Sequence, residues 1–516
     1  MNLHDLFAIP RKRNANKVAI EYKDEQGQTS TWTYELLHDA VDRLALGLQA
    51  WGLGKGDRVA FFLSNRPEFA IAYLAVIKIG AIMVPINLRY RKLEISHILA
   101  DCAPKLLVTE HSLQSILDEV QGSIQMPALL YVDEWSRWVN SALHNPHSII
   151  HENVGADDLA LIMYTSGTTG RSKGAMISHN NVLTWVTTLL TAWAWEQNDR
   201  LLLCLPLFHV HGLVNGLHCA LAAGATLLLR PQFEKEQTLA ELCGDLPSGL
   251  PTVFFAVPTI YVRLVEELNY QLGTLHTPLA FSHMRLFCSG SAPLAAETMI
   301  EFERLTGHSI LERYGMTETG MNLSNPYIGA RVPGTVGLPL TGVSMRIIKP
   351  SNDKVLVDVA SGEEGELLVR GSNVFLGYWN APEKTASSFS NDASGVQWFH
   401  TGDLARQDPE TGYVTLLGRR HELIISGGFN IYPREIEEML TTFPGISEAA
   451  VVAMPHNEWG EVPSAYLVCS CSIDEGELVA YCRKQLASFK VPRKFTYVEA
   501  LPRNAMGKIV KNLLPR

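Results

Sequence analysis

Apolar residues recur at helical spacing in residues 33–49 of the chain. Leu37, Val41 and Leu44 fall on one face of that segment, together with further leucine and alanine residues. Thr33 is a residue type that commonly caps a helix, and the glycines of the LGKG sequence end the pattern. We therefore expect an amphipathic helix here, with one face buried.

Short strands and helices alternate in the segment that follows. The expected strands are RVAFFL, AIMVPI and KLLVTE, and between them lie the helix PEFAIAYLAVIKIG, which Pro67 opens, and the helix ISHILADC. Strands that alternate with helices favour mostly parallel sheets with helices on both faces. The predicted fold class is therefore α/β.

The last hundred residues have a different pattern. A turn, DPETG, and a charged segment, GRRHE, precede the helix PREIEEML, the strands EAAVVAMP and SAYLVCS, and the helix DEGELVAYCRKQLA. These elements predict a small, mobile α+β domain behind a hinge. We expect a large N-terminal domain over residues 1–420 and a C-terminal domain over residues 421–516.

The composition is that of a globular protein, because 47% of the 516 residues are hydrophobic. A chain of this length usually needs at least two cores. The formal net charge of −10 argues against general affinity for nucleic acid or anionic membranes. The longest apolar runs, such as LLLCLPLF, are shorter than the ~20 residues of a membrane span, and the first residues lack an apolar signal segment. We expect a cytoplasmic protein, monomeric or homodimeric, without integral membrane association.

Eight cysteines are scattered along the chain without paired CxxC spacing or accompanying histidines. This distribution favours reduced, mostly buried thiols over disulfides or a metal site. The cysteines are Cys102, Cys204, Cys219, Cys243, Cys288, Cys469, Cys471 and Cys482.

Residues 164–179, YTSGTTGRSKGAMISH, combine hydroxyl side chains, glycines and a lysine. Glycines let backbone amides approach a ligand, hydroxyls donate hydrogen bonds and Lys173 supplies positive charge, so the segment suits a polyphosphate. The flanking sequences LALIM and GAMIS read as strands, and the next helix begins only after them. A Walker loop runs straight into a helix with the spacing GxxxxGK[ST], so a P-loop phosphotransferase is disfavoured.

Five further motifs follow in order: LPLFHVHG, CSGSAPL, ERYGMTET, HTGD with GRR, and PRNAMGK. Together with the phosphate loop they resemble the acyl-adenylate-forming enzymes, which include acyl-CoA synthetases, adenylation domains and firefly luciferase. The resemblance covers nearly the whole chain. It implies that a carboxylate attacks the α-phosphate of ATP and expels pyrophosphate, after which the thiol of coenzyme A expels AMP. A small carboxylic acid, ATP, Mg²⁺ and coenzyme A are the implied ligands.

The resemblance assigns nucleotide binding to several of these motifs. Lys173 and the loop hydroxyls are implied to grip the β- and γ-phosphates, and Tyr314 to lie near adenine. Asp403 can accept hydrogen bonds from both ribose hydroxyls, and Arg419 can support the same sugar. The full implied set is Thr165, Ser166, Gly167, Thr168, Thr169, Gly170, Lys173, Ser289, Gly290, Ser291, Ala292, Pro293, Arg313, Tyr314, Gly315, Met316, Thr317, Asp403 and Arg419.

Three residues are implied in catalysis by the resemblance. Lys508 bridges the carboxylate and the α-phosphate, Glu318 is a Mg²⁺ ligand, and Thr317 touches phosphate. A lone glutamate suits Mg²⁺, which takes one or two carboxylates together with substrate phosphates. Read in isolation, Lys508 is a solvated charge near a terminus and Glu318 a solvated helix-end carboxylate.

The small domain is implied to close and then rotate, so that Gly427, Gly428 and Phe429 guide coenzyme A. At the pivot, relatives commonly carry Asp or Lys where this chain has His421. Ile425 stands where many relatives carry lysine, and we assign it no catalytic role.

The cluster around ERYGMTET resembles malonyl-CoA synthetases more than fatty-acid or aryl ligases. Malonate or methylmalonate has a second carboxylate that needs a cation or several donors. Arg285 and His209 are the candidates, with Met316 lining the pocket. Arg285 is equally consistent with a structural salt bridge, and His209 and His211 with core imidazoles. The alternatives are a medium- or long-chain fatty acid ligase, a phosphotransferase and a non-catalytic binder.

Overall fold

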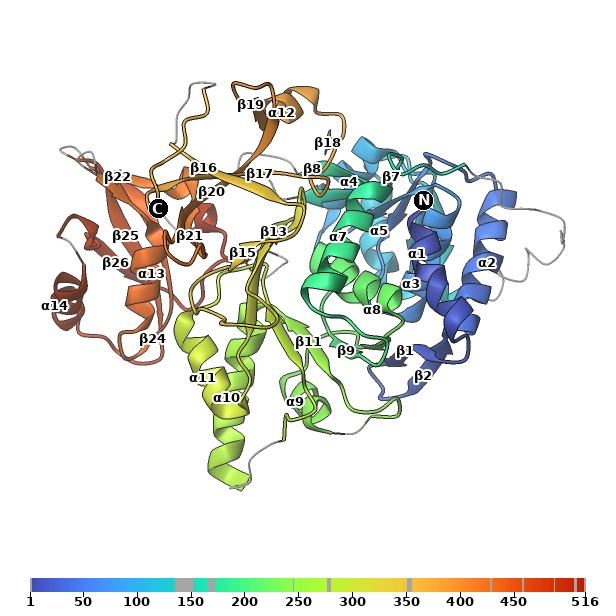
Figure 1. The fold of residues 1–516 in the computed structure, drawn as a ribbon, viewed down its shortest axis with the longest axis horizontal. Coiled ribbons are helices and arrows are strands. Elements are labelled where there is room, and N and C mark those ends of the chain that lie inside the picture. Colours follow the sequence, from blue (N-terminus) through green and yellow to red (C-terminus); the bar gives the residue numbers. More distant parts are fainter. Residues whose placement is uncertain are drawn as a thin grey trace. The chain divides into compact units, whose positions relative to one another are not determined.

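The computed structural model describes residues 2–134, 153–165, 172–244, 246–275, 280–349, 355–426, 429–456, 459–486, 488–504 and 508–514 (Figure 1). The chain divides into two compact units. The first unit comprises Met1–Pro333, Gly337–Ser344 and Arg370–Ser388, and the second unit comprises Gly334–Val336, Met345–Val369 and Phe389–Arg516. Residues 421–516 lie wholly within the second unit, and the domain boundary expected at residue 420 stays a prediction.

A seven-stranded sheet within the described residues of the first unit carries the phosphate loop at one edge. The four pairings of β7 with β4, β4 with β3, β3 with β5 and β5 with β6 are parallel, whereas β8 pairs antiparallel with both β7 and β18. In spatial order the strands are β18 (Gly377–Tyr378), β8 (Lys173–Ser178), β7 (Leu159–Thr165), β4 (Ile82–Pro85), β3 (Arg58–Phe61), β5 (Leu106–Thr109) and β6 (Ala128–Tyr131).

A second, nine-stranded sheet of the first unit is parallel from β1 to β13 and ends in antiparallel strands. Its central parallel strands, β9 to β12, are almost continuously apolar, as expected when both faces of a sheet are covered. In spatial order the strands are β15 (Leu338–Pro339), β14 (Gly320–Ser324), β13 (Leu311–Met316), β12 (Leu286–Ser289), β11 (Val253–Ala256), β9 (Arg200–Leu203), β10 (Thr226–Leu229), β1 (Val18–Lys23) and β2 (Thr29–Thr33).

The helices of the first unit connect these strands, and α10 packs against α11 (Figure 1). The predicted α/β class is confirmed. The helices are α1 (Leu3–Arg13), α2 (Tyr34–Ala50), α3 (Pro67–Lys78), α4 (Lys92–Cys102), α5 (Gln114–Gln121), α7 (His179–Ala192), the π-helix η4 (His211–His218), α8 (Cys219–Ala223), α9 (Lys235–Cys243), α10 (Pro258–Leu275), α11 (Ala296–Thr306) and α12 (Pro382–Ser387), with 3₁₀ turns η1 (His111–Leu113) and η2 (Val132–Glu134).

The second unit is built on two five-stranded sheets. One holds β16 (Ser344–Ile348), β17 (Glu364–Arg370), β19 (Phe389–Asn391), β20 (Gln397–Gln407) and β21 (Val414–Arg419), and the other holds β22 (Ile424–Ser426), β23 (Phe429–Ile431), β24 (Ile446–His456), β25 (Gly460–Cys469) and β26 (Lys494–Tyr497). Their helices are η5 (Arg420–Glu422), α13 (Pro433–Thr441), α14 (Glu475–Gln485), η6 (Ser488–Lys490) and η7 (Lys511–Leu513). The predicted α+β character of the C-terminal segment is confirmed.

Local sequence signals act as expected at several element ends. The Thr33 hydroxyl accepts a hydrogen bond from the Leu36 amide at 3.2 Å, which caps α2. Pro67 is the first residue of α3, where its missing N–H costs nothing. All eight cysteines lie in the described ranges and are free thiols, five of them buried, as predicted. Within the same ranges, no helix is long and apolar enough to span a bilayer.

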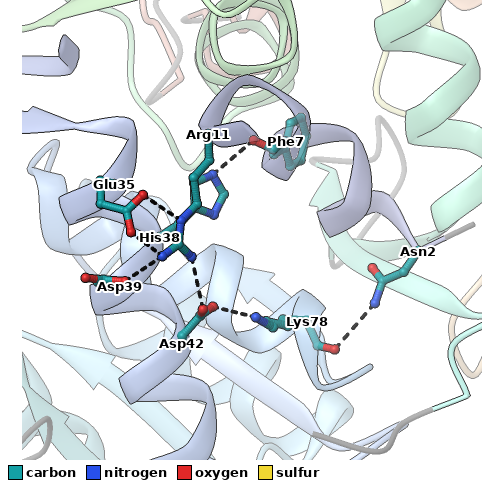
Figure 2. Close-up of polar contacts among 8 residues, drawn as sticks. All are labelled: Asn2, Phe7, Arg11, Glu35, His38, Asp39, Asp42 and Lys78. Atoms are coloured by element: carbon teal, nitrogen blue, oxygen red, sulfur yellow. Dashed lines mark hydrogen bonds and ion pairs between the residues drawn. The ribbon is translucent and has the colours of Figure 1, made fainter. Parts of the chain in front are cut away.

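Helix α1 is held on the first unit by charges and by buried rings. Figure 2 shows Arg11 donating to Glu35 at 2.6 Å, Asp39 at 2.7 Å and Asp42 at 3.2 Å. These carboxylates are partly exposed, so each pair contributes little. Burial of the apolar face of α1, which includes the fully buried Phe7, therefore supplies most of the attachment.

Histidines on α1 and in contact with it are neutral because they are buried. His4 lies on α1, His179 accepts a hydrogen bond from the Leu3 amide at 3.1 Å, and His218 packs against Phe7 with ring centroids 5.0 Å apart. Burial lowers the pKa of His4 to about 3, that of His179 to about 4 and that of His218 to about 3. Among the described residues, neither ring nitrogen of His218 has a hydrogen-bond partner. Its ring stacks on Tyr73 at 5.2 Å.

We expect replacement of His218 by phenylalanine to flatten the dependence of stability on pH. An unfolded histidine binds a proton near pH 6.5 but folded His218 only near 3, so the free energy of unfolding falls as pH falls between these values. His218→Phe keeps the stacking and removes up to ~1.4 kcal/mol per pH unit from that slope. Urea unfolding at pH 7.5, 6 and 5 measures it, and an unchanged slope contradicts the expectation.

Candidate active site

The phosphate loop joins two strands, as the sequence predicted, and these strands pair antiparallel. Thr165 at the end of β7 lies opposite Lys173 at the start of β8, and helix α7 begins only at His179. This arrangement brings two predicted phosphate-binding side chains to the base of the loop, without the strand-to-helix turn of a P-loop. The remaining predicted loop residues, Ser166, Gly167, Thr168, Thr169 and Gly170, lie outside the described residues.

Glu318 lies in the tight turn between β13 and β14 and is only 6% exposed. Its carboxylate accepts hydrogen bonds from Thr165 at 3.4 Å and from the Tyr378 hydroxyl at 3.1 Å. Thr317 precedes it in the same turn. The fold therefore brings Glu318 to the phosphate loop from 153 positions away. A nearly buried carboxylate among hydroxyls suits one protein ligand of a Mg²⁺ that is otherwise held by phosphates.

The loop over residues 289–293 leaves the carboxyl end of β12, beside β13. Ser291 has a φ of +72°, an uncommon conformation for a residue with a side chain and one that often marks functional loops. The Leu294 amide donates to the Glu312 carboxylate at 3.1 Å, which fixes the end of the loop. Tyr314, assigned to adenine, is 8% exposed on β13, and Met316 ends the same strand.

Arg313 lies under this loop and is 3% exposed. A Cβ atom added at Gly290 would be 2.4 Å from the Arg313 Cζ atom, so the position admits glycine alone without rearrangement. Arg313 interacts with the Cys288 thiol, but its Nε and Nη2 atoms have no hydrogen-bond partner among the described residues. Burial lowers the pKa of Arg313. The sequence assigned Arg313 to the nucleotide; although the Glu312 carboxylate favours its charged form, the unpartnered Nε and Nη2 atoms are equally suited to a second anion.

His211 and Asn215 lie on the π-helix η4, a helix type often found at functional sites, and His211 is within reach of the charge of Arg313. The His211 Nδ1 atom shares a hydrogen bond with the Ser291 hydroxyl at 3.2 Å. Burial, followed by the charge of Arg313, lowers the pKa of His211. In the described structure His211 Nε2, Asn215 Oδ1 and Ser289 Oγ also have no hydrogen-bond partner. The first unit thus holds a buried group of polar atoms around a cation. His209 is half-buried, and its Nδ1 accepts from the His211 amide at 3.3 Å.

Arg285 is committed to a carboxylate of the protein. Its Nε and Nη2 atoms each lie 2.5 Å from an oxygen of Asp199, and its Nη1 donates to the Trp193 carbonyl at 2.9 Å. It also lies over the rings of Trp195 and Tyr327. Arg285 comes directly before the first residue of β12, and Ser289 is the last residue of that strand, so the two residues lie at opposite ends of β12. This geometry favours the structural salt bridge that the sequence left open.

In the second unit, Asp403 and Arg419 face each other on β20 and β21. Arg419 Nε donates to Asp403 Oδ1 at 2.8 Å and its Nη1 donates to the Thr401 carbonyl at 3.1 Å. Asp403 is 6% exposed. The pairing fixes the carboxylate while leaving acceptor capacity for hydroxyl groups.

Lys508 is exposed on a loop of the second unit. Its amide donates to the Asn504 side chain at 3.0 Å, and its carbonyl accepts from the Asn504 amide at 2.8 Å. Of the other assignments in this unit, Gly427 and Gly428 lie outside the described residues, as do the side chains of Phe429, His421 and Ile425. Those roles stay predictions.

Comparison with known proteins identifies the class. The AMP-binding enzyme family matches residues 7–379, and the AMP-binding enzyme C-terminal domain matches residues 435–508. The chain belongs to the AMP-binding enzyme family.

Individual relatives refine this class. The mouse mitochondrial malonate–CoA ligase ACSF3 is 36% identical over 93% of this chain and 86% of its own length. A feruloyl-CoA synthase from Amycolatopsis is 34% identical over 94% of this chain and 93% of its own. The crystal structure of ATP-bound MatB from Rhodopseudomonas palustris superposes with a TM-score of 0.88 at 39% identity, covering 100% of this chain and 98% of that one. The protein is an AMP-forming acyl-CoA synthetase, most like the malonyl-CoA synthetases.

Proposed function

We propose that the protein is a malonyl-CoA synthetase, which joins malonate or methylmalonate to coenzyme A and converts ATP to AMP and pyrophosphate. The observation that carries the proposal is the buried Arg313 guanidinium, whose Nε and Nη2 atoms have no hydrogen-bond partner among the described residues. A buried charge is costly unless an opposite charge joins it. A monocarboxylic acid uses its one carboxylate at the α-phosphate, whereas malonate has a second for Arg313.

The polar atoms around Arg313 support the same substrate. His211 Nε2 offers a further hydrogen bond in a site where burial keeps the imidazole neutral. A neutral donor can hold a carboxylate without adding a second charge that would need its own partner. The relatives named as malonate–CoA ligases agree with this choice, while the feruloyl-CoA synthase keeps other acids as the alternative, including medium- or long-chain fatty acids.

The proposed reaction uses the remaining residues in two steps. The substrate carboxylate attacks the α-phosphorus of ATP and the bond to the β-phosphate oxygen breaks; Thr165 and Lys173 hold the departing pyrophosphate, and Lys508 stabilises the charge where the two anions meet. Glu318 is the proposed protein ligand of Mg²⁺, which neutralises phosphate charge. The thiolate of coenzyme A then attacks the acyl carbon and AMP leaves. Asp403 is the proposed ribose acceptor.

Several finer assignments stay part of this proposal. They are Thr317 at phosphate, the loop hydroxyls, Gly427, Gly428 and Phe429 at coenzyme A, and a rotation of the C-terminal domain about His421. The cytoplasmic location and the monomeric or homodimeric state also stay proposals, and the mouse relative is named as a mitochondrial protein.

The first test is a panel of acids. Pyrophosphate release should be fastest with malonate or methylmalonate, slower with acetate, octanoate and benzoate, and accompanied by AMP rather than ADP. A second measurement with coenzyme A present identifies the acceptor. Faster release with octanoate or benzoate would favour the alternative acids, and ADP would favour a phosphotransferase.

Replacement of Arg313 should affect malonate selectively. Arg313→Met removes the proposed partner of the second carboxylate, so kcat/KM for malonate should fall about 10²–10³-fold, while butyrate, which has no second carboxylate, changes little. Arg285→Met is the matched control. It leaves the buried Asp199 without its cation, so it should lower the melting temperature and affect both acids alike. Equal effects of Arg313→Met on malonate and butyrate contradict the proposed pairing.

Replacement of Lys508 should separate the two half-reactions. Lys508→Ala should lower malonate-dependent pyrophosphate release about 10²–10³-fold, because the charge between the carboxylate and the α-phosphate is lost, and leave thioester formation from supplied malonyl-adenylate largely intact. Equal loss of both half-reactions would overturn the assignment of Lys508 to adenylation.

A further inference from the structure

A second lysine near the C-terminal end of the chain is partly buried between two carboxylates. Lys511 Nζ lies 2.8 Å from Glu422 Oε2 in η5 and 2.7 Å from Glu437 Oε1 in α13. The side chains of Lys511 and Glu437 are only 16% and 19% exposed. Glu437 also accepts a hydrogen bond from the Val451 amide of β24 at 2.7 Å. One ammonium group therefore connects the segment that carries Lys511 with two other elements of the second unit, and Glu437 links it further to β24.

This cluster differs from an ordinary surface ion pair. Burial raises the pKa of Glu437, and the two carboxylates raise that of Lys511 against the effect of its own burial. Removing one member of such a cluster leaves the others charged and poorly solvated, which is far costlier than losing an exposed pair. The cluster therefore favours one position of the tail over others.

Lys511 follows Lys508 by three residues and lies at the exit of the same loop. The loop is closed by the Val510 amide, which donates to the Pro502 carbonyl at 2.8 Å, and by the hydrogen bonds between Asn504 and Lys508. On either side of the loop, Leu501 and Leu514 are buried together against Ala450 and Tyr466. Apolar packing thus holds the base of the loop, and Lys511 adds a charged contact three residues after Lys508.

We propose that Lys511 is a positioning residue for adenylation: its contacts with Glu422 and Glu437 hold the loop that carries Lys508. The inference rests on the proposed function, in which Lys508 acts at the α-phosphate. Lys511 itself touches neither substrate nor nucleotide in this account. It acts through backbone geometry, since an error of about 1 Å in the placement of a catalytic group can cost about 10²-fold in rate.

The test uses the full-length chain and measures both half-reactions. Lys511→Met keeps a flexible side chain of similar length without charge, and should lower malonate-dependent pyrophosphate release about 10- to 100-fold. Thioester formation from supplied malonyl-adenylate should change by less than about threefold. Lys511→Arg restores the charge and should recover most of the lost adenylation rate.

A lysine–glutamate pair that involves the same helix, α13, provides a control. Lys490 donates to Glu435 of α13 at 2.7 Å, and this pair makes no contact with the loop of Lys508 among the described residues. Lys490→Met should leave both half-reactions unchanged. If Lys511→Met folds poorly, Glu422→Gln removes only one carboxylate and should produce a smaller loss confined to adenylation.

A double variant separates positioning from general stability. In a Lys508→Ala background, Lys511→Met should cause no further loss of residual pyrophosphate release, because the group it positions is already gone. A further loss there, or equal losses of both half-reactions in Lys511→Met alone, overturns the inference. If Lys508→Ala leaves pyrophosphate release unchanged, the proposed role of Lys508 is overturned instead, so the two failures are distinguishable.

Discussion

The first unit places a guanidinium group directly beneath the backbone of Gly290, and the surrounding site is shaped by that charge. Arg313 is nearly fully buried and forms no ion pair with a carboxylate in the described ranges. Gly290 has no room for a side chain because Arg313 occupies that space. Burial and this neighbouring cation together keep His211 neutral. A site of this kind is incomplete by itself, because a buried cation is stable only when an anion joins it.

Several charges described in the second unit follow the opposite rule, since they are paired with charges of the same unit. Arg419 pairs with Asp403, Arg420 with the buried Glu366 at 2.8 Å, and Lys511 with Glu422 and Glu437. These pairs fix segments near the expected pivot and near Lys508. The first unit thus offers unmatched polar atoms to a ligand, whereas the second unit uses matched charges to hold its functional residues in place.

Short-range patterns predicted the elements well. The helix capped by Thr33, the helix opened by Pro67 and the two strands around the phosphate loop all occur, because caps, proline and apolar alternation act within a few residues. The motif residues Asp403 and Arg419 also face each other through a local hairpin. The catalytic assignments follow from the resemblance to the acyl-adenylate-forming enzymes, which identifies residues by their place in a motif and not by the side chains that they contact.

Side-chain partnerships distant in sequence were not predictable from these patterns. Arg285 was a candidate for the acid, yet it is paired with Asp199, 86 positions away. Arg313 was placed at the nucleotide, and nothing local to ERYGMTET indicates that its guanidinium is buried without a carboxylate. The local sequence patterns did not indicate a role for Lys511, because its partner Glu422 lies 89 positions earlier. The sequence determined the elements, the class of chemistry and the phosphate loop, since these depend on neighbouring residues. Only the tertiary structure decided which charges are paired and which are left for a ligand, because pairing depends on strand order and on burial.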